Sequence, residues 1–159
     1  MAIVQSHATA DIKGNSRHIC ELMTQDRDVG AGLIHLPEAA LSGYVKSQSP
    51  NRGSVASNEV KDGRINIRET ARQLEVWTVV GYNHPMARPN RPRTNLFVIS
   101  DKGKPITSYD KRYCSHSDIT YWYSAGYHAN VFSVDGFRID CVLCIEIQFP
   151  KVFRQYEQL

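Results

Sequence analysis

Two cysteines near the end of the printed sequence, Cys141 and Cys144, are the residues whose type and spacing point most directly to chemistry. They lie in the stretch CVLCIEIQFP, after an apolar run and before a proline that can begin a helix. Such a pair can be a redox Cys-x-x-Cys, half of a zinc site, or one nucleophile with a bystander. It can equally be two small residues of a buried strand, and the pair alone leaves all four interpretations open.

The surrounding sequence argues against a metal or a redox role for this pair. A zinc site needs two more ligands at similar spacing, but Cys20 and Cys114 are isolated and the sequence has no His-x-x-x-His. We therefore predict no metal site. A redox pair usually opens a helix from a loop, whereas Cys141 continues an apolar strand pattern. The remaining functional interpretation places Cys144 at a turn from strand to helix, where free backbone N–H groups favour a thiolate and can hold an oxyanion.

Two charged residues, Glu38 and Lys111, follow predicted strands. Glu38 comes after the apolar stretch LIHLP, and Lys111 comes after ITSYD. Open α/β sheets place their sites at strand ends, so a base, a cation and a thiol could meet there. Each side chain also has a structural alternative, because Glu38 could favour a helix start and Lys111 could be a solvated loop charge.

The elements that must position these side chains follow from periodicity and turn signals. We predict a helix over 15–28 with Asn15 or Ser16 as its N-cap, a polar loop over 45–57, and an irregular proline-rich segment over 84–93. The other predicted helices cover 65–75 and 149–159, and the predicted strands cover 2–5, 33–38, 76–82, 95–100, 104–109, 130–134 and 137–145. Helices alternate with strands early and hairpins come later, which indicates an α/β layered domain with a mixed sheet.

Three segments, in this order, resemble the pattern of the nitrilase superfamily of carbon–nitrogen hydrolases. That pattern has Pro-Glu followed by Gly-Tyr, then Tyr-x-Lys, then Cys-x-acid with Phe-Pro behind it. The matching residues of this chain are Pro37, Glu38, Gly43 and Tyr44, then Tyr109 and Lys111, then Cys144, Glu146, Phe149 and Pro150. The resemblance covers the whole chain, and three ordered motifs are a far stronger signal than any one of them.

The resemblance implies a fold of the α-β-β-α sandwich type, with a mixed β-sheet and flanking helices. The chain, 1–159, is expected to be a single carbon–nitrogen hydrolase domain that carries only the N-terminal part of this fold. Family members continue well past the helix of the nucleophile, whereas this sequence ends at Leu159. A half sandwich would expose an apolar sheet face, so we expect a homo-oligomer.

The resemblance also implies roles for the three central residues. Cys144 would attack the carbon of an amide, ω-amide or nitrile and form a thioester. Glu38 would act as the general base, and Lys111 with the backbone N–H of Ile145 would stabilise the tetrahedral oxyanion. The chemistry requires a small-molecule substrate and no cofactor.

Further positions are assigned by the same resemblance. Asp118 falls where many members carry a second glutamate, and it is expected to orient Lys111 or the substrate. Tyr44 and Glu146 are expected to contact the substrate. Gln148 occupies the position where carbamoyl-amino-acid hydrolases tend to carry arginine, which argues against that class of substrate.

Composition limits the remaining classes of function. The 159 residues are 42% hydrophobic and 22% charged, which is typical of a soluble globular domain. A net charge of +3 is well below that of a dedicated nucleic-acid binder, so no nucleic-acid partner is predicted. No apolar run is long enough for a membrane span, and the N-terminus lacks the layout of a signal peptide. We therefore expect a cytoplasmic protein with reduced thiols.

Two rival hypotheses stay open at this point. His35 or His116 could serve Cys144 as a base, as in a Cys–His hydrolase. Alternatively, the chain could be a non-catalytic truncated remnant that keeps the site residues but acts as a binding or assembly partner.

Overall fold

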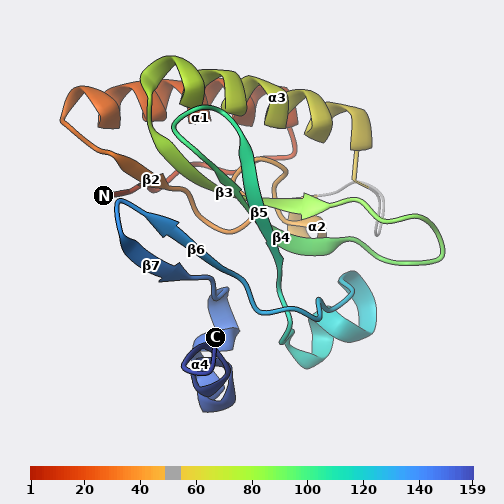
Figure 1. Cartoon of the computed structure of the whole chain (residues 1–159). Coiled ribbons are helices and arrows are strands. Elements are labelled where there is room, and N and C mark those ends of the chain that lie inside the picture. Colours follow the sequence, from red (N-terminus) through yellow and green to blue (C-terminus); the bar gives the residue numbers. More distant parts are fainter. Residues whose placement is uncertain (49–54) are drawn as a thin grey trace.

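A computed structural model describes residues 1–48 and 55–159 (Figure 1). Its main feature is a five-stranded sheet with the strand order β1-β2-β3-β4-β5. The first three strands are parallel, and β3, β4 and β5 pair antiparallel, so the sheet is mixed as predicted. The strands are β1 (Ala2–Ile3), β2 (Leu33–His35), β3 (Trp77–His84), β4 (Arg93–Ile99) and β5 (Pro105–Asp110).

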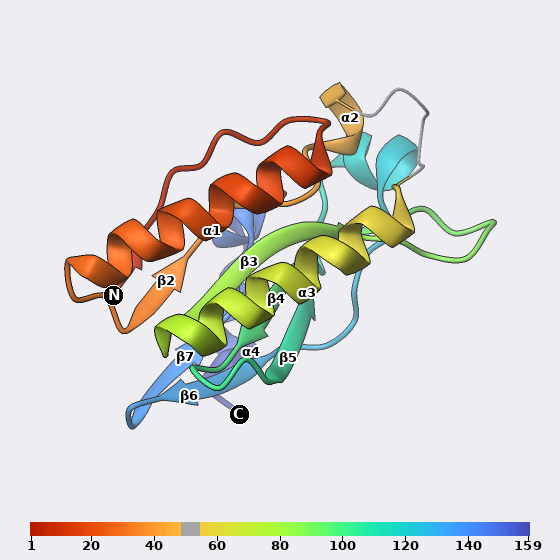
Figure 2. The ribbon, with the colours of Figure 1, turned by 90° about the horizontal axis from the view of Figure 1, so that it is seen from above.

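Two long helices, α1 (Ile12–Asp28) and α3 (Ser57–Leu74), lie side by side against one face of this sheet (Figures 1 and 2). Apolar side chains recur on one stripe of each helix, and that stripe faces the sheet. The buried cluster between helices and sheet includes Ile19, Met23, Ile67, Val80 and Phe97. This layer supports the sheet from behind and leaves its other face for a second set of contacts.

The hairpin of β6 (Val131–Val134) and β7 (Phe137–Asp140) packs against that other face (Figure 1). A second buried cluster joins Phe132 and Val134 of the hairpin to Val79 and Val98 of the sheet. The chain then enters a 3₁₀ turn, η2 (Cys144–Gln148), and ends in α4 (Pro150–Tyr156). The predicted Asp-Gly turn and the helix beginning at Pro150 are both confirmed.

Both long helices begin earlier than predicted. Asp11, not Asn15 or Ser16, caps α1, because its side chain accepts a hydrogen bond from the Gly14 N–H at 2.9 Å. Asn15 is instead buried and donates to the backbone oxygens of Thr9 and Leu41. The start of α3 at 57 rather than 65 was missed because its first two turns are mostly polar and carry a single large apolar residue, Val60.

The predicted strands 33–38 and 137–145 both end early, at His35 and Asp140. The residues that follow leave the ladders to build turns, and these turns hold Glu38 and Cys144. The predicted loop over 45–57 begins with a short helix, α2 (Val45–Gln48), and its positions 49–54 lie outside the described residues. The segment between β5 and β6 contains one π-helical turn, η1 (Asp118–Trp122). In the described part of the chain, no helix is both long and apolar enough to cross a bilayer.

Candidate active site

The turn that carries Glu38 folds back over strand β3. The Leu36 N–H donates to the Val79 oxygen at 2.8 Å, and the Leu41 N–H donates to the Gly81 oxygen at 3.0 Å. The end of β3 holds the far side of the turn, because the Asn83 amide donates to the Gly43 oxygen at 2.5 Å. The turn therefore leaves its own strand and carries Glu38 across the neighbouring one.

Lys111 lies one residue beyond the end of β5. Its N–H donates to the Thr94 oxygen at 2.8 Å, and its own oxygen accepts from the Gly126 N–H at 2.8 Å. The backbone of Lys111 is thus held by β4 on one side and by the 123–127 segment on the other. Strand β2 is parallel to β3, and β4 is antiparallel to both β3 and β5. Strands β2 and β5 therefore run in the same direction, and their carboxyl ends share one edge of the sheet.

Glu38 and Lys111 meet at this edge as a buried ion pair. Lys111 Nζ donates to Glu38 Oε1 at 2.9 Å, which joins residues 73 positions apart in sequence. The two side chains are only 5% and 14% exposed. Burial lowers the pKa of Lys111, but the Glu38 carboxylate, together with smaller effects of Cys144 and Cys114, outweighs it, so the net pKa is raised. At neutral pH Lys111 is therefore an ammonium ion.

Cys144 lies on the tip of a strained turn. It is exposed, and its backbone is in the left-handed region with φ of 52°. Such a conformation costs a non-glycine residue about 1–3 kcal/mol and is most often found where function requires it. No described residue accepts a hydrogen bond from the N–H of Ile145, which directly follows the thiol. Free backbone N–H groups of this kind are donors from which an oxyanion site can be built.

Tyr44 interacts electrostatically with Glu38, Cys144 and Lys111. Its pKa is raised by partial burial, then by Glu38 and Cys144, and it is lowered in part by Lys111. Cys144 likewise contributes to the raised pKa of Lys111. Glu38, Lys111, Cys144 and the half-exposed ring of Tyr44 therefore share one small region, although they come from four separate segments.

Asp118 lies near this region but forms no described ion pair with Lys111. It begins η1, and its N–H donates to Ser115 Oγ at 3.2 Å. Its charge acts on Cys114, whose pKa is raised to about 11 by burial first, with Lys111 opposing and Asp118 adding. Within the described chain, Glu38 is the carboxylate that pairs with Lys111, and the orienting role of Asp118 stays a prediction.

Glu146 is fully buried, which does not suit the substrate contact expected of it. Its carboxylate faces inward, toward the backbone that follows Lys111. The hydroxyl of Tyr109 donates to both carboxylate oxygens at 2.8 and 2.7 Å. Every acceptor position of Glu146 that the structure describes is therefore occupied from within the protein.

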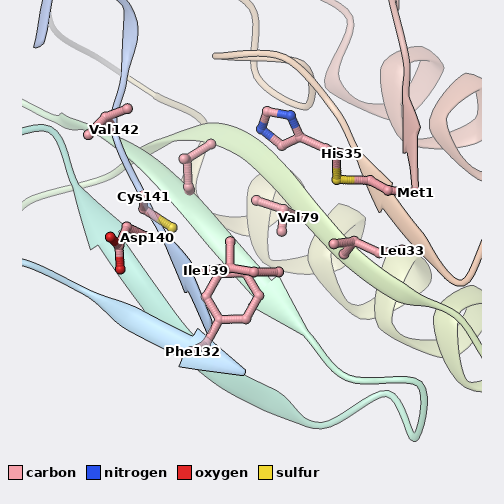
Figure 3. A pocket seen from close by; sticks show the side chains of 10 residues that line it. Met1, Leu33, His35, Val79, Phe132, Ile139, Asp140, Cys141 and Val142 are labelled. Carbon is pink, nitrogen blue, oxygen red and sulfur yellow. The ribbon is translucent and has the colours of Figure 1, made fainter. Parts of the chain in front are cut away.

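Cys141 and His35 face a different part of the molecule. Both line an apolar hollow of about 240 Å³ between the hairpin and the sheet face opposite the helices (Figure 3). Burial lowers the pKa of His35, and it raises the pKa of Cys141 to about 12. Cys144 is not among the residues that line this hollow, and both thiols are free. The described residues contain no group of three or more His, Cys, Asp or Glu placed to hold a metal.

Gly81 is a site-forming residue that the sequence reasoning missed. A Cβ at this position would meet the Pro37 oxygen at 2.2 Å and the Ala39 nitrogen at 2.8 Å. The turn carrying Glu38 can cross β3 only because position 81 has no side chain. A glycine inside an otherwise β-prone run is a signal of close backbone approach, so the sequence did contain this clue.

The mixed sheet with its helices, and the order of the sequence motifs, are those of the nitrilase superfamily. The chain belongs to the carbon-nitrogen hydrolase family, whose sequence pattern matches residues 1–158. It is 26% identical over 138 residues to a 2-oxoglutaramate amidase of Bacillus subtilis (strain 168). The aligned residues cover 86% of this chain and 51% of that protein. The chain thus spans about half the length of this curated relative.

Solved structures of an amidase from Nesterenkonia sp. AN1 have the same fold. The complex of a variant with butyramide has a TM-score of 0.83 at 21% identity, and the match covers 96% of this chain and 58% of that one. A second variant carries the acetamide moiety of fluoroacetamide at its active site cysteine, with a TM-score of 0.82 at 22% identity. At this level of identity the likeness establishes the fold, including the mixed sheet and the helices beside it.

Proposed function

We propose that this chain carries the catalytic centre of a thiol-dependent amidohydrolase that acts on small amides. The observation that carries the proposal is the 2.9 Å pair of Glu38 and Lys111, because it joins a carboxylate and a cation from distant segments, and Cys144 interacts electrostatically with that cation. The family membership and the amide-binding relatives support the same reaction class.

In the first half-reaction Glu38 takes the proton of the Cys144 thiol, and the sulfur attacks the amide carbon. The C=O π electrons move to oxygen, and Lys111 with the Ile145 N–H stabilises that oxyanion. When the carbonyl re-forms, the C–N bond breaks, and the leaving nitrogen takes the proton held by Glu38. Ammonia or an amine departs and a thioester remains on Cys144.

In the second half-reaction Glu38 removes a proton from water, and the hydroxide adds to the thioester carbon. Collapse of this intermediate breaks the C–S bond, and the sulfur recovers the proton from Glu38. The products are a carboxylic acid and the free thiol, so no external oxidant, metal or cofactor is consumed. The exposed position of Cys144 gives both the substrate and the water access to the sulfur.

The test is ammonia release from butyramide, acetamide and 2-oxoglutaramate by the chain and three variants. We expect Cys144→Ala and Glu38→Gln to reduce turnover by about 1,000-fold or more, since each removes a group that acts in both steps. Cys141→Ala is the matched control, because it removes a thiol that faces the apolar hollow. Turnover that survives in Cys144→Ala would overturn the proposal. No turnover, together with a Cys144 that reacts like the other thiols, would support the alternative of a non-catalytic partner.

Nitriles are a second substrate class for the same three residues. Sulfur attack on a nitrile carbon gives a thioimidate, in which negative charge develops on nitrogen instead of oxygen. The same donors can stabilise either atom, so butyronitrile belongs in the same assay. Release of ammonia from the amides alone would restrict the proposal to amidase activity.

A further inference from the structure

Glu146 connects the segments that carry Lys111 and Cys144. Its Oε1 atom accepts from the N–H groups of Arg112 at 2.8 Å and Tyr113 at 3.0 Å, the two residues that follow Lys111. Its Oε2 atom accepts from the N–H of Leu143 at 2.7 Å, the residue that precedes Cys144. One carboxylate therefore holds the residues next to the cation and the residue next to the thiol.

The surroundings of this carboxylate consist of donors. Besides the three backbone N–H groups, the Tyr109 hydroxyl donates to both oxygens, and Tyr109 in turn accepts from Arg112 Nε at 3.2 Å. An ionised carboxylate is acceptor-only, so four donor groups on two oxygens suit the charged form. A buried carboxylate without such partners would be strongly unfavourable, so Glu146 and the two segments must keep one mutual geometry.

We infer that Glu146 is a positioning residue that holds the Glu38–Lys111 pair against the Cys144 thiol. It acts through the backbones of the two segments and does not touch the substrate. The inference rests on the proposed function, because it explains how the proposed base, cation and nucleophile keep their spacing. It also explains why a fully buried acid lies two residues after an exposed thiol.

Glutamine at position 146 would keep the size of the side chain and remove one acceptor. Whichever way its amide is turned, the NH₂ group must face a backbone N–H, either that of Leu143 or those of Arg112 and Tyr113. One of the two segments is then released. We therefore expect the coupling between Glu38 and Cys144 to weaken even where the protein stays folded.

The experiment is a double-mutant cycle on the iodoacetamide alkylation rate of Cys144, mapped by mass spectrometry. The quantity measured is the factor by which Glu38→Gln changes that rate. We expect a factor of about 10 in the native chain and of less than about 3 in Glu146→Gln, because the two sites act as one unit. Ser100→Ala is the control, since it removes two hydrogen bonds of a buried serine in the β4–β5 turn. There the factor should be unchanged.

A second variant covers the case in which Glu146→Gln does not fold. Tyr109→Phe removes one donor and leaves the three backbone donors of Glu146, so it should lower the factor part of the way. A factor that is the same in the native chain, Tyr109→Phe and Ser100→Ala overturns the positioning role. A factor of about 1 in the native chain itself means that Glu38 and Cys144 are not coupled, which overturns the proposed function and the inference with it.

Discussion

At the residue scale, the four cysteines illustrate how burial separates chemically identical groups. Cys144 is exposed on a turn, Cys114 and Cys20 are half-buried, and Cys141 is buried in an apolar cluster. The redox interpretation of Cys141 and Cys144 required two thiols that face each other. In the structure, Cys141 belongs to the core beneath the hairpin, while Cys144 is exposed and interacts electrostatically with Lys111.

Thiol labelling should follow this difference in burial. Burial raises the pKa of Cys114 to about 11 and that of Cys141 to about 12. Because the thiolate is the reacting species, a pKa raised from 9 by two or three units removes about 99% or more of it at pH 8. We expect iodoacetamide to label Cys144 first and Cys141 last in the native chain. After unfolding in urea the rates should converge, and a native Cys141 that reacts as fast as Cys144 would contradict this ordering.

At the element scale, the site depends on two turns that leave their strands early. The predicted strands were too long at 33–38 and 137–145, since apolar residues continue past the last ladder bonds. Their continuation packs the turns against neighbouring strands instead of extending the sheet. The candidate site residues Glu38 and Cys144 therefore lie where the periodic pattern persists but the strand pairing has ended.

The crossing of β3 by the Glu38 turn can be tested at Gly81. We expect Gly81→Ala to destabilise the chain by about 1–3 kcal/mol, because the new methyl group overlaps backbone atoms that cannot move independently. The displaced turn should also weaken the effect of Glu38→Gln on Cys144 alkylation. Gly32→Ala is the matched control, since its Cβ would meet nothing within 4 Å. Urea unfolding measures the first effect, and equal stabilities of the two variants would contradict the steric argument.

At the scale of the whole molecule, one helical layer and one hairpin enclose the sheet from opposite faces (Figures 1 and 2). The hollow beneath the hairpin remains open to solvent and is lined mainly by apolar side chains (Figure 3). Homo-oligomerisation and a cytoplasmic location stay predictions. Light scattering over a range of concentrations addresses the first of them.

Global stability should fall as pH rises from about 9 to about 12. The folded chain keeps the Cys141 proton until pH nears its raised value, whereas the unfolded chain loses it near 9. The unfolded state then binds fewer protons, so the free energy of unfolding decreases by up to about 1.4 kcal/mol per pH unit for this group. The raised pKa of Lys111 acts in the same direction above 10.5. Denaturant unfolding at several pH values measures the slope.

Two thiol variants separate the contributions to that slope. Cys141→Ala removes the buried thiol, so its unfolding free energy should depend less on pH in this range. Cys144→Ala removes a thiol at the surface and leaves the Cys141 contribution in place. A slope that is identical in the native chain and Cys141→Ala would show that the buried thiol does not control alkaline stability.

The sequence by itself determined the class of fold, most of the order of the elements and the choice of Glu38, Lys111 and Cys144 as candidate site residues. These follow from local patterns and from ordered motifs, which need no three-dimensional information. The inward position of Glu146 was decided only by tertiary structure, because an acid two residues after a thiol can face either solvent or the interior. The Glu38–Lys111 pair and the strained turn at Cys144 likewise depend on how separate turns pack across a sheet, which no local pattern encodes.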